Sequence, residues 1–559
     1  MKSTHFLVVA SLGLMISERT SAQTPPNAGS LNQQLEREQL ERPVESAPQL
    51  RIERDSATAA PTADQQRILV KSLHITGARI YSSAQLLAIT GFSAARELTL
   101  GELRTFAAGI ARHYRESGYP LAQAYLPAQD IVNGVVTIAV LEGEYGQVSL
   151  RNQSNLADGV ANGLLDGLNS GDSIALAPLE NRLLLLSDIP GVEVRSTLVP
   201  GASVGAADLI VDVLPGQRFN GTFSVDNLGD RYTGENRLGA TLGFNNPTNR
   251  GDLLSLRVLS SDAGLHYGRV AYQIPFGRFS TGVAYSHMEY RLGKEFKSLD
   301  ADGTASITSL FGSYSLIRSR DHNLNVQLNL DNKDFRDRLN ITSTVADKKA
   351  RVAMLSLNGN ARDSFGGGGL SSYALTWSSG EIDIRNTEAH AVDAATVRSN
   401  GRYNKLGLSA ARLQYVNERL SLYAAFNGQI ASTNLDTSEK LGLGGISAVR
   451  AYPSGESYGD QGYVLNLEAR TPLHSLSAKV PGQLQLIGFV DTGRVNLNKS
   501  PWDTGSNYRS LHGTGIGVNW AEHNSFAVSA TLARRLGSEP VTSAPDDKSR
   551  FWLQAVKYF

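Results

Sequence analysis

The stretch Leu324-Asn-Val-Gln-Leu-Asn-Leu330 alternates aliphatic and polar side chains without a break. Because successive side chains of a β-strand point to opposite faces, such a segment has one apolar and one polar face. Tyr463-Val-Leu-Asn-Leu-Glu-Ala-Arg470 repeats the pattern, and residues 420–428 and 483–490 show looser versions of it. No helical period persists in residues 217–559. We therefore predict that this part of the chain is all β.

Alternation alone leaves two folds open, because the polar face can be the outside of a soluble sandwich or the inside of a membrane barrel. The N-terminus favours the barrel. A basic start, an apolar run over Phe6–Ile16 and small residues up to Ala22 are typical of a secretory signal peptide over residues 1–22. That run is too short to cross ~30 Å of hydrocarbon, and no other segment approaches ~18 apolar residues. Strands closed into a barrel remain as the way to span a membrane.

The length and the ending of the chain lead to the same interpretation. About 340 residues accommodate roughly 16 strands of ~9–11 residues with their loops, so residues 216–559 are predicted to form a 16-stranded antiparallel transmembrane β-barrel. The chain ends in Phe551-Trp-Leu-Gln-Ala-Val-Lys-Tyr-Phe559. A last strand with a C-terminal aromatic residue resembles the targeting signal of outer-membrane barrels, which makes Phe559 the predicted targeting residue. Lys557 lies at a position that is usually apolar, and its long side chain can extend to the interface.

The composition excludes several classes of function. Lys+Arg and Asp+Glu both total 53, and this balance argues against nucleic-acid binding, which requires a basic excess. The hydrophobic share of 41% is below the ~45–50% of an average globular chain, as expected for a protein with a wet lumen. The absence of cysteine removes thiolate metal sites and cysteine nucleophiles. The histidines are scattered, so we expect no metal site and no cofactor.

Three short motifs could suggest an enzyme. Gly201-Ala-Ser-Val-Gly205 and Gly455-Glu-Ser-Tyr-Gly459 fit the Gly-x-Ser-x-Gly pattern of a nucleophile elbow, but neither is predicted to lie between a strand and a following helix. Gly366-Gly-Gly-Gly369 lacks the Lys and Ser/Thr of a phosphate loop, and a hairpin turn explains it better. We therefore predict that the protein is not an enzyme.

Residues 23–43 contain a short polar helix. It is predicted over Leu31–Leu40, with Ser30 as its N-cap and Pro43 as its stop. Its apolar stripe is too narrow to hold a helix in water, so the segment must lodge elsewhere in the protein or remain mobile. The leucines of this plug helix are Leu31, Leu35 and Leu40, of which the first two share a face with Gln39.

A linker and two similar units follow. Residues 44–67 are rich in Pro, Ala, Ser, Thr and charge without periodicity, which predicts a linker that spans several nanometres when extended. Residues 68–143 and 144–215 each have the predicted order β-α-α-β-β, for which generic α+β domains remain an alternative. The predicted elements are strand 68–76, helices 83–90 and 101–117, strands 119–126 and 135–142, then strand 147–150, helices 156–168 and 178–186, and strands 192–199 and 209–214.

The loop Gly444–Gly462 resembles the loop-6 signature of two-partner secretion transporters, the relatives of the filamentous haemagglutinin transporter. Phe489-Val-Asp-Thr-Gly493 resembles the barrel-wall motif of that family, and the two α+β units resemble tandem POTRA domains. The loop of the wider superfamily often has Gly after its Arg, where this chain has Ala451; a methyl group fits there unless the backbone needs a positive φ. Three further stretches support the resemblance: Asp226–Gly234, Asn246–Asp252 and Leu316–Arg320.

The two motifs predict a contact inside the barrel. Leu486 and Val490 are predicted to face lipid, and alternation then turns Phe489 and Asp491 towards the lumen. A carboxylate in a loop-filled lumen is poorly solvated and needs a cationic partner. The resemblance implies that Arg450 is that partner in a bidentate pair, whereas a solvated Arg and a strand-end Asp without contact are the alternative. The implied site residues are Val449, Arg450, Ala451 and Tyr452 at the loop tip, and Phe489, Asp491 and Gly493 on the wall.

By the same resemblance, the protein is expected to be an outer-membrane channel that exports an unfolded partner without ATP. The partner would be a secreted exoprotein (an adhesin, a haemolysin or a toxin) that binds the POTRA pair in the periplasm by adding a strand to a sheet edge. The plug helix would leave the pore during export. The barrel-assembly machinery would insert the barrel into outer-membrane lipid. The alternatives are an assembly or insertion factor of the same superfamily and a passive diffusion porin.

Overall fold

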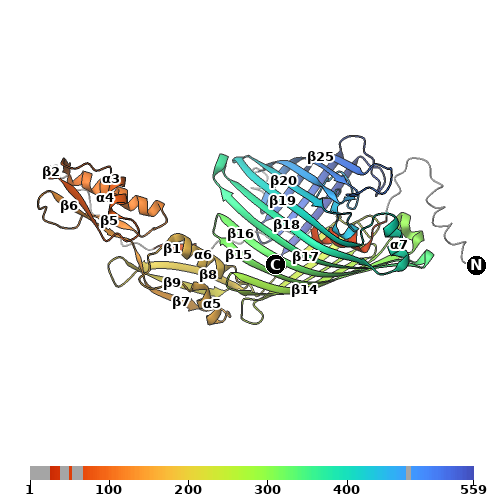
Figure 1. The fold of residues 1–559 in the computed structure, drawn as a ribbon, viewed down its shortest axis with the longest axis horizontal. Helices are drawn as coiled ribbons and strands as arrows, with labels where there is room; N and C mark the ends of the chain where they lie inside the picture. Colours follow the sequence, from red (N-terminus) through yellow and green to blue (C-terminus); the bar gives the residue numbers. More distant parts are fainter. Residues whose placement is uncertain (1–24, 38–48, 53–66, 474–479) are drawn as a thin grey trace, which may run out of the picture.

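The computed structural model describes residues 25–37, 49–52, 67–473 and 480–559. Two small α+β units lie in a row at one end of a large barrel (Figure 1). The predicted signal peptide of residues 1–22, the predicted helix residue Leu40 and most of the predicted linker lie outside the described residues. No helix within the described ranges is long and apolar enough to cross a membrane.

In the described part of the chain, sixteen strands form one closed antiparallel barrel, which confirms the predicted fold class. Each strand pairs with the next in sequence, apart from two short strands in one loop, and the last strand pairs with the first. The barrel strands are β10 (Phe219–Asp226), β11 (Arg237–Asn245), β12 (Leu253–Ser261), β13 (Leu265–Phe276), β14 (Phe279–Arg291), β15 (Ala301–Arg318), β16 (His322–Leu339), β17 (Thr344–Asp363), β18 (Gly369–Ile384), β19 (Gly401–Asn417), β20 (Leu420–Ala431), β23 (Gln461–Pro472), β24 (Gln483–Asn496), β25 (Tyr508–Glu522), β26 (Phe526–Arg535) and β27 (Ser549–Tyr558).

The wall of the barrel is apolar outside and polar inside. On β16, Leu328 and Leu330 are exposed on the outer face, whereas Lys333 lies on the lumen side and is 4% exposed. Because this sheet closes on itself, its apolar outer face has no second sheet to cover it, which excludes a soluble sandwich. The loops carry the 3-10 turns η1 (Lys294–Leu299), η2 (Asn340–Thr342) and η3 (Phe365–Gly367) and the helix α7 (Thr387–Ala395).

The C-terminus lies at the seam where the barrel closes. Strands β10 and β27 pair over five residues, from Thr222 to Asp226, which is fewer than any other neighbouring pair of described barrel strands. Beyond the last of these pairs, the backbone of Phe559 exchanges two hydrogen bonds with Gly221, and its ring stacks on Phe223 at 5.2 Å between centroids. The terminal aromatic residue therefore extends the shortest seam of the barrel.

The unit farther from the barrel contains β2 (Arg67–Val70), β3 (Ser72–Thr76), α3 (Ser83–Thr90), β4 (Arg96–Thr99), α4 (Leu100–Glu116), β5 (Gln123–Tyr125) and β6 (Val135–Leu141). The prediction of one strand over residues 68–76 is wrong, because the chain changes partner at Lys71: β2 pairs with β4 and β3 with β6. The strand β4 was not predicted. Both helices begin with a capping box, built on Ser82 and on Thr99, in which side chain and backbone satisfy each other's hydrogen bonds.

The unit next to the barrel contains β7 (Glu144–Asn152), α5 (Asp158–Leu165), α6 (Leu176–Ser187), β8 (Val192–Pro200) and β9 (Ala206–Pro215), in the predicted order. Its sheet has a fourth strand, β1 (Gln49–Ile52), which runs parallel to β8. The prediction that residues 44–67 are only a linker is therefore wrong for these four residues. A sheet edge presents unpaired backbone N–H and C=O groups, and β1 pairs with those of β8.

Two of the stretches that support the family resemblance join this unit to the barrel floor. Arg318, the last residue of β15, forms a bidentate pair with Asp188 at 2.6 and 2.7 Å. Arg320 in the same turn contacts Glu180 at 3.1 Å. In the turn between β11 and β12, the carbonyl of Asn249 accepts a hydrogen bond from the N–H of Ala157 at 2.8 Å. The barrel and the adjacent unit are thus fixed to each other by charged and polar contacts.

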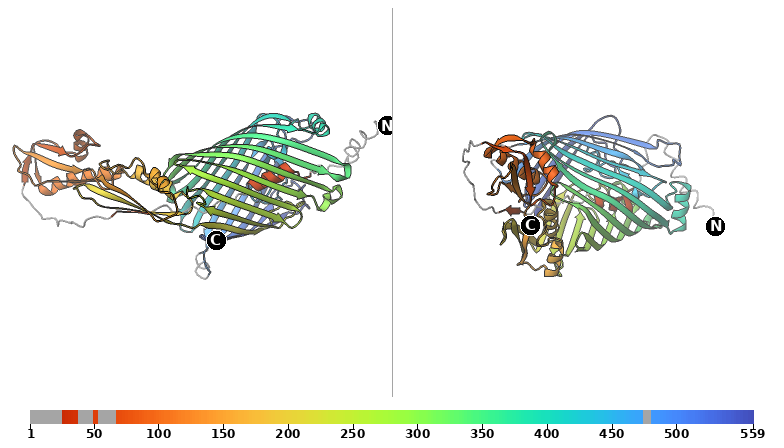
Figure 2. Two further views of the ribbon diagram at one scale, coloured as in Figure 1. Left: turned by 90° about the horizontal axis from the view of Figure 1, so that it is seen from below. Right: turned by 60° about the vertical axis from the view of Figure 1, so that its left-hand side comes forward.

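The predicted plug helix is α2 (Ala28–Arg37), which lies inside the barrel (red in Figure 2). It begins three residues before the predicted start, so the assignment of Ser30 as N-cap is wrong. Asn27 caps the helix instead: its side-chain Oδ1 accepts from the N–H of Ser30 at 3.0 Å, and the Ser30 hydroxyl accepts from the N–H of Asn27 at 3.1 Å. Asn and Ser are comparable as caps, and the pair occupies both ends of one capping box.

Candidate functional site in the barrel lumen

The loop between β20 and β23, residues 432–460, folds back into the lumen, and we call it loop 6. Its stem is a small hairpin of β21 (Leu441–Gly442) and β22 (Tyr458–Gly459), preceded by the 3-10 turn η4 (Thr437–Glu439). The tip turns sharply at Gly445 and Gly455, where φ is 106° and 78°. Such values cost little only for glycine, so these two residues allow the loop to reverse direction within the barrel.

Arg450 at the tip of loop 6 binds Asp491 of β24. Its Nη2 and Nε donate to the two carboxylate oxygens at 2.7 and 2.9 Å, and its backbone N–H donates to Oδ2 at 3.0 Å. Its Nη1 donates to Glu468 of β23 at 2.6 Å. Asp491 is fully buried and Arg450 is 8% exposed. The two predicted residues therefore form a bidentate, charge-assisted pair that is shielded from water.

Neighbouring groups complete what we call the Arg450 network, which consists of Arg450, Asn466, Glu468, Arg470, Phe489 and Asp491. The guanidinium carbon lies 3.6 Å from the centre of the Phe489 ring, a cation–π contact. Asn466 donates to Asp491 at 2.7 Å, and Arg470 donates to Glu468 at 2.7 Å. Two guanidinium groups thus face two carboxylates, so the buried network has no net charge. The indole N–H of Trp552 also holds the Arg450 carbonyl, at 2.7 Å.

The other predicted tip and wall residues pack closely around this network. Val449, Ala451 and Tyr452 are fully buried. Ala451 does not have a positive φ, so its methyl group causes no backbone strain at this position. A Cβ added to Gly493 would lie 2.6 Å from Leu443 Cδ1, and one added to Gly513 would lie 2.6 Å from the Ala451 Cβ. Glycine at 513 therefore lets the loop backbone at Ala451 approach the wall, whereas a side chain at 493 would require Leu443 to move.

Several residues of the site were not predicted. Asn466 and Glu468 lie directly across the ladder from Asp491 and Phe489, and alternation in Tyr463–Arg470 already placed them on the polar face. Glu456 of loop 6 forms a second anchor: its carboxylate accepts from the N–H groups of Thr542 and Ser543 at 2.9 and 3.0 Å. No local pattern indicated this contact or that of Trp552, because each partner comes from a distant loop or strand.

The helix α2 docks against loop 6. Its residues Leu31 and Leu35 are each 2% exposed and belong to an apolar cluster with Tyr232, Met288 and Leu435. The N–H of Ala28 donates to Asp337 of β16 at 2.8 Å. Two glutamines continue the contact along the loop stem: Gln33 donates to the Lys440 carbonyl and Gln34 to the Tyr458 hydroxyl. Helix and loop therefore occupy the lumen as neighbours in direct contact.

Charged side chains on the wall hold the base of loop 6. Glu439 lies between Lys333 of β16 at 3.0 Å and Lys405 of β19 at 2.8 Å. Asp436 pairs with Lys348 of β17 at 2.8 Å. Both acidic residues flank Ser438, whose Cβ would be 2.8 Å from a Cβ added to Gly29 of α2. Helix and loop thus come into close contact where the loop is fastened to the wall.

One titratable group connects α2 to a different loop. Asp230, between β10 and β11, is 4% exposed and accepts from the N–H of Tyr232 at 2.8 Å. Burial raises the pKa of Asp230 to about 7, although hydrogen bonds from Tyr232 and from Gln34 of α2 oppose the shift. The negative charge of Glu235 nearby adds to it. The pKa of this carboxyl group therefore depends in part on the hydrogen bond from α2, which favours the charged form.

Comparison with known proteins identifies relatives over the full length. Residues 205–520 match the family model described as haemolysin secretion/activation protein ShlB/FhaC/HecB, and residues 68–143 match that of the ShlB-type POTRA domain. The heme/hemopexin transporter protein HuxB of Haemophilus influenzae is 27% identical over 98% of both chains. The outer membrane transporter CdiB of Dickeya dadantii is 24% identical over 80% of this chain and 76% of its own. The solved structure of CdiB from Escherichia coli matches with a TM-score of 0.72 at 20% identity, covering 97% of this chain and 100% of that one.

Proposed function

The chain belongs to the haemolysin secretion/activation family ShlB/FhaC/HecB, and on that premise we propose that it exports one partner exoprotein through its barrel and that α2 is the part which moves. The barrel lies in the outer membrane with the POTRA units in the periplasm. The observation that carries the proposal is the content of the lumen: loop 6 is fastened by buried charge, whereas α2 is seated by two leucines and hydrogen bonds. This arrangement favours a transporter over a passive porin, for which the POTRA units would have no role.

The proposed organisation follows the expected boundaries. Residues 1–22 are the signal peptide, residues 23–43 the plug segment and residues 44–67 the linker. Residues 68–143 and 144–215 are the two POTRA domains, and residues 216–559 are the barrel. The element order within the described residues supports these divisions, with β1 as the one part of the linker that joins a sheet.

Cargo is proposed to bind the POTRA units as an added strand. The edge of β8 is occupied by β1, whose four residues pair with residues 195–198. A cargo strand at this edge must replace β1. Because β1 and α2 belong to the same N-terminal segment, loss of β1 from the sheet lengthens the tether of α2 and favours its departure from the lumen. Export then needs no ATP, since cargo folding outside the cell can bias the movement.

Two partners of the barrel itself are also proposed. The barrel-assembly machinery would recognise the last strand with Phe559, whose side chain is 48% exposed at the seam between β10 and β27. Outer-membrane lipid would cover the apolar outer face.

A reversible tether tests the proposal. The natural chain has no cysteine, so a Gly29→Cys/Ser438→Cys pair would be its only thiols. A disulfide needs a Cβ–Cβ distance of ~3.5–4.5 Å, which a shift of about 1 Å allows here. We expect the oxidised variant to stop secretion of its partner exoprotein, and dithiothreitol to restore it. Each single variant is the control. Secretion at the wild-type level with the disulfide formed would refute the role of α2.

A further inference from the structure

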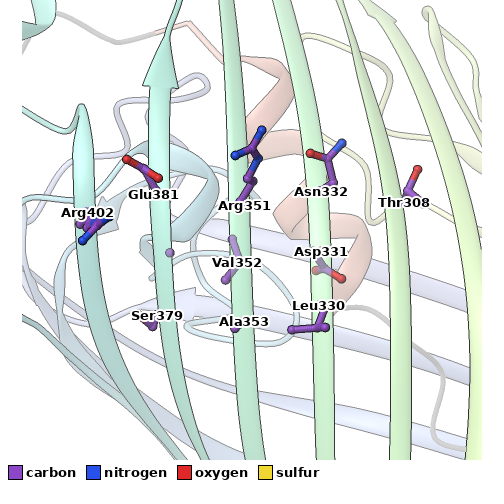
Figure 3. A pocket seen from close by; sticks show the side chains of 11 residues that line it. Thr308, Leu330, Asp331, Asn332, Arg351, Val352, Ala353, Ser379, Glu381 and Arg402 are labelled. Carbon is purple, nitrogen blue, oxygen red and sulfur yellow. The ribbon is translucent and has the colours of Figure 1, made fainter.

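A row of polar side chains crosses the outer face of the barrel immediately above its apolar belt. Thr308, Asn332, Arg351, Glu381 and Arg402 are directly opposite one another across strands β15 to β19. All five point outwards, as their strand positions require and as Figure 3 shows. They line a shallow groove of about 670 Å³ whose lower border is formed by Leu330, Ala353 and Ser379.

The belt below the groove is apolar. Towards the POTRA units, the next outward-facing row after this lower border consists of Leu328, Leu355, Trp377 and Leu406, paired in that order. These four side chains are between 37% and 49% exposed on the outer face. Acyl chains of lipid would cover them in the membrane. Arg351 and Arg402 therefore lie where the hydrocarbon ends and the headgroups begin.

Charges farther from the belt are already paired, and those in the groove are not. Arg336 contacts Asp347 at 2.6 Å, Arg338 contacts Asp302 at 2.9 Å and Lys349 contacts Asp334 at 3.8 Å. Among the residues that the structure describes, neither Arg351 nor Arg402 has an ion pair or a side-chain hydrogen bond. Glu381 lies between them across the ladder without reaching either, so the row carries two cations and one anion.

We propose that this groove binds the phosphorylated headgroup of an outer-leaflet lipid. The guanidinium groups of Arg351 and Arg402 bind phosphate oxygens, and the lipid's chains lie over Leu330 and the belt below. Adjacent strands are ~4.8 Å apart, so the two arginines are about 10 Å apart along the row and can bind two phosphates of one lipid. Guanidinium is well suited to this role, because its fork binds phosphate with two parallel hydrogen bonds. Glu381 repels the same phosphates and limits the affinity.

Native mass spectrometry of the full chain in neutral detergent tests the proposal. The probes are lipid A with two phosphates, lipid A with one phosphate, and phosphatidylcholine. We expect the two-phosphate lipid to bind most tightly, and Arg351→Gln/Arg402→Gln to weaken it by at least about tenfold. Glu381→Gln should tighten binding a few-fold. Arg336→Gln is the matched control, because Arg336 also points outwards from this wall but already has a partner. This variant should change binding less than about twofold.

Three outcomes would overturn the proposal. The first is equal binding of the two-phosphate lipid by the wild type and the double variant. The second is binding of phosphatidylcholine as tight as that of lipid A, which would mean that the apolar surface alone holds the lipid. The third is displacement of the lipid by millimolar inorganic phosphate, which would make the groove a site for free anions. Folding of each variant is checked by its heat-dependent migration in gels, and Glu381→Gln keeps the test decisive if the double variant does not fold.

Discussion

Loop 6 and α2 share one lumen, but the loop is fastened to the wall by ion pairs, whereas the helix is held by leucines and by hydrogen bonds, one of them to the Asp337 carboxylate. At the loop tip, Asp491 receives three hydrogen bonds from Arg450 alone. The helix contributes Leu31 and Leu35 to an apolar cluster. A buried charge that loses its partner is costly, while an apolar helix face can be re-covered elsewhere. This difference supports the proposal that the tip of loop 6 remains in place while α2 leaves.

The largest effect is expected from Asp491→Ala. It leaves the Arg450 guanidinium buried with only Glu468 and Phe489, and removal of one partner from a buried pair costs about 3–5 kcal/mol. We expect hydrogen exchange in residues 444–456 to accelerate strongly and secretion of the partner to be lost, as with Arg450→Ala, while the barrel stays inserted.

The matched control for Asp491→Ala is Arg231→Ala. Arg231 pairs with Glu295 at 2.7 Å, and that carboxylate side chain is 56% exposed. Pairs of this kind contribute ~0–1 kcal/mol, so exchange in loop 6 should remain unchanged. If Asp491→Ala behaved like this control, the contrast between loop and helix would be wrong.

A smaller effect is expected from Leu31→Ala/Leu35→Ala, which should promote opening of the channel rather than abolish secretion. Truncation of a buried leucine costs ~2–5 kcal/mol. Here the loss weakens the docking of α2 and not the stability of the barrel. The helix should leave more often, so planar-bilayer recordings should show a higher open fraction, with secretion retained. Glu36→Ala on the same helix is the comparison, because it removes an exposed carboxylate whose charge acts on Lys333 and leaves both leucines in place. A closed channel in the double variant would mean that hydrogen bonds, and not leucines, seat the helix.

The pH dependence of opening should be smaller again. Burial raises the pKa of Asp230 to about 7 while α2 is docked, and the hydrogen bond from Gln34 of α2 lowers it. Gly455 of loop 6 also lies against this carboxylate, so Asp230 stays covered when α2 leaves and the hydrogen bond is what it loses. The pKa is then higher in the undocked state, so the docked state binds the proton less tightly and docking weakens as pH falls through about 7. The open fraction should increase from pH 8 to pH 5. Asp230→Asn should abolish this increase, and an unchanged slope in that variant would assign it to another group.

Much of the barrel was predictable because the side-chain period of a strand is fixed at two. Alternation alone turns Asp491 and Glu468 inwards and Val490 outwards, as observed. Alternation predicts the face to which a side chain points but not what it contacts. The assignment of Arg450 as the partner of Asp491 therefore depended on the family resemblance. The contact of Trp552 with the Arg450 carbonyl joins residues 102 apart in sequence and had no local signal.

The N-terminal segment was harder to predict, since its structure is imposed by what it touches. Asn27 and Ser30 are both good caps, and which of them caps the helix depends on where α2 docks. At that position the N–H of Ala28 donates to Asp337. Gln49–Ile52 is too short to show a period, and it becomes a strand because β8 offers an edge. The strand prediction for the first POTRA unit failed for a similar reason at Lys71, because the residues on its two sides pair into two different sheets.

The smallest effect is expected at Ala451, the residue that follows Arg450. Ala451→Gly removes one buried methyl group and adds backbone freedom, together about 1–2 kcal/mol. The reverse change on the wall, Gly513→Ala, should be far worse, because its Cβ would lie 2.6 Å from that methyl group. The double variant Ala451→Gly/Gly513→Ala moves the methyl group from loop to wall and should recover most of the loss, measured as the temperature at which gel migration changes. If Ala451→Gly alone harmed secretion as much as Asp491→Ala does, the methyl group itself would hold the tip, and the bidentate pair would no longer explain why loop 6 stays while α2 departs.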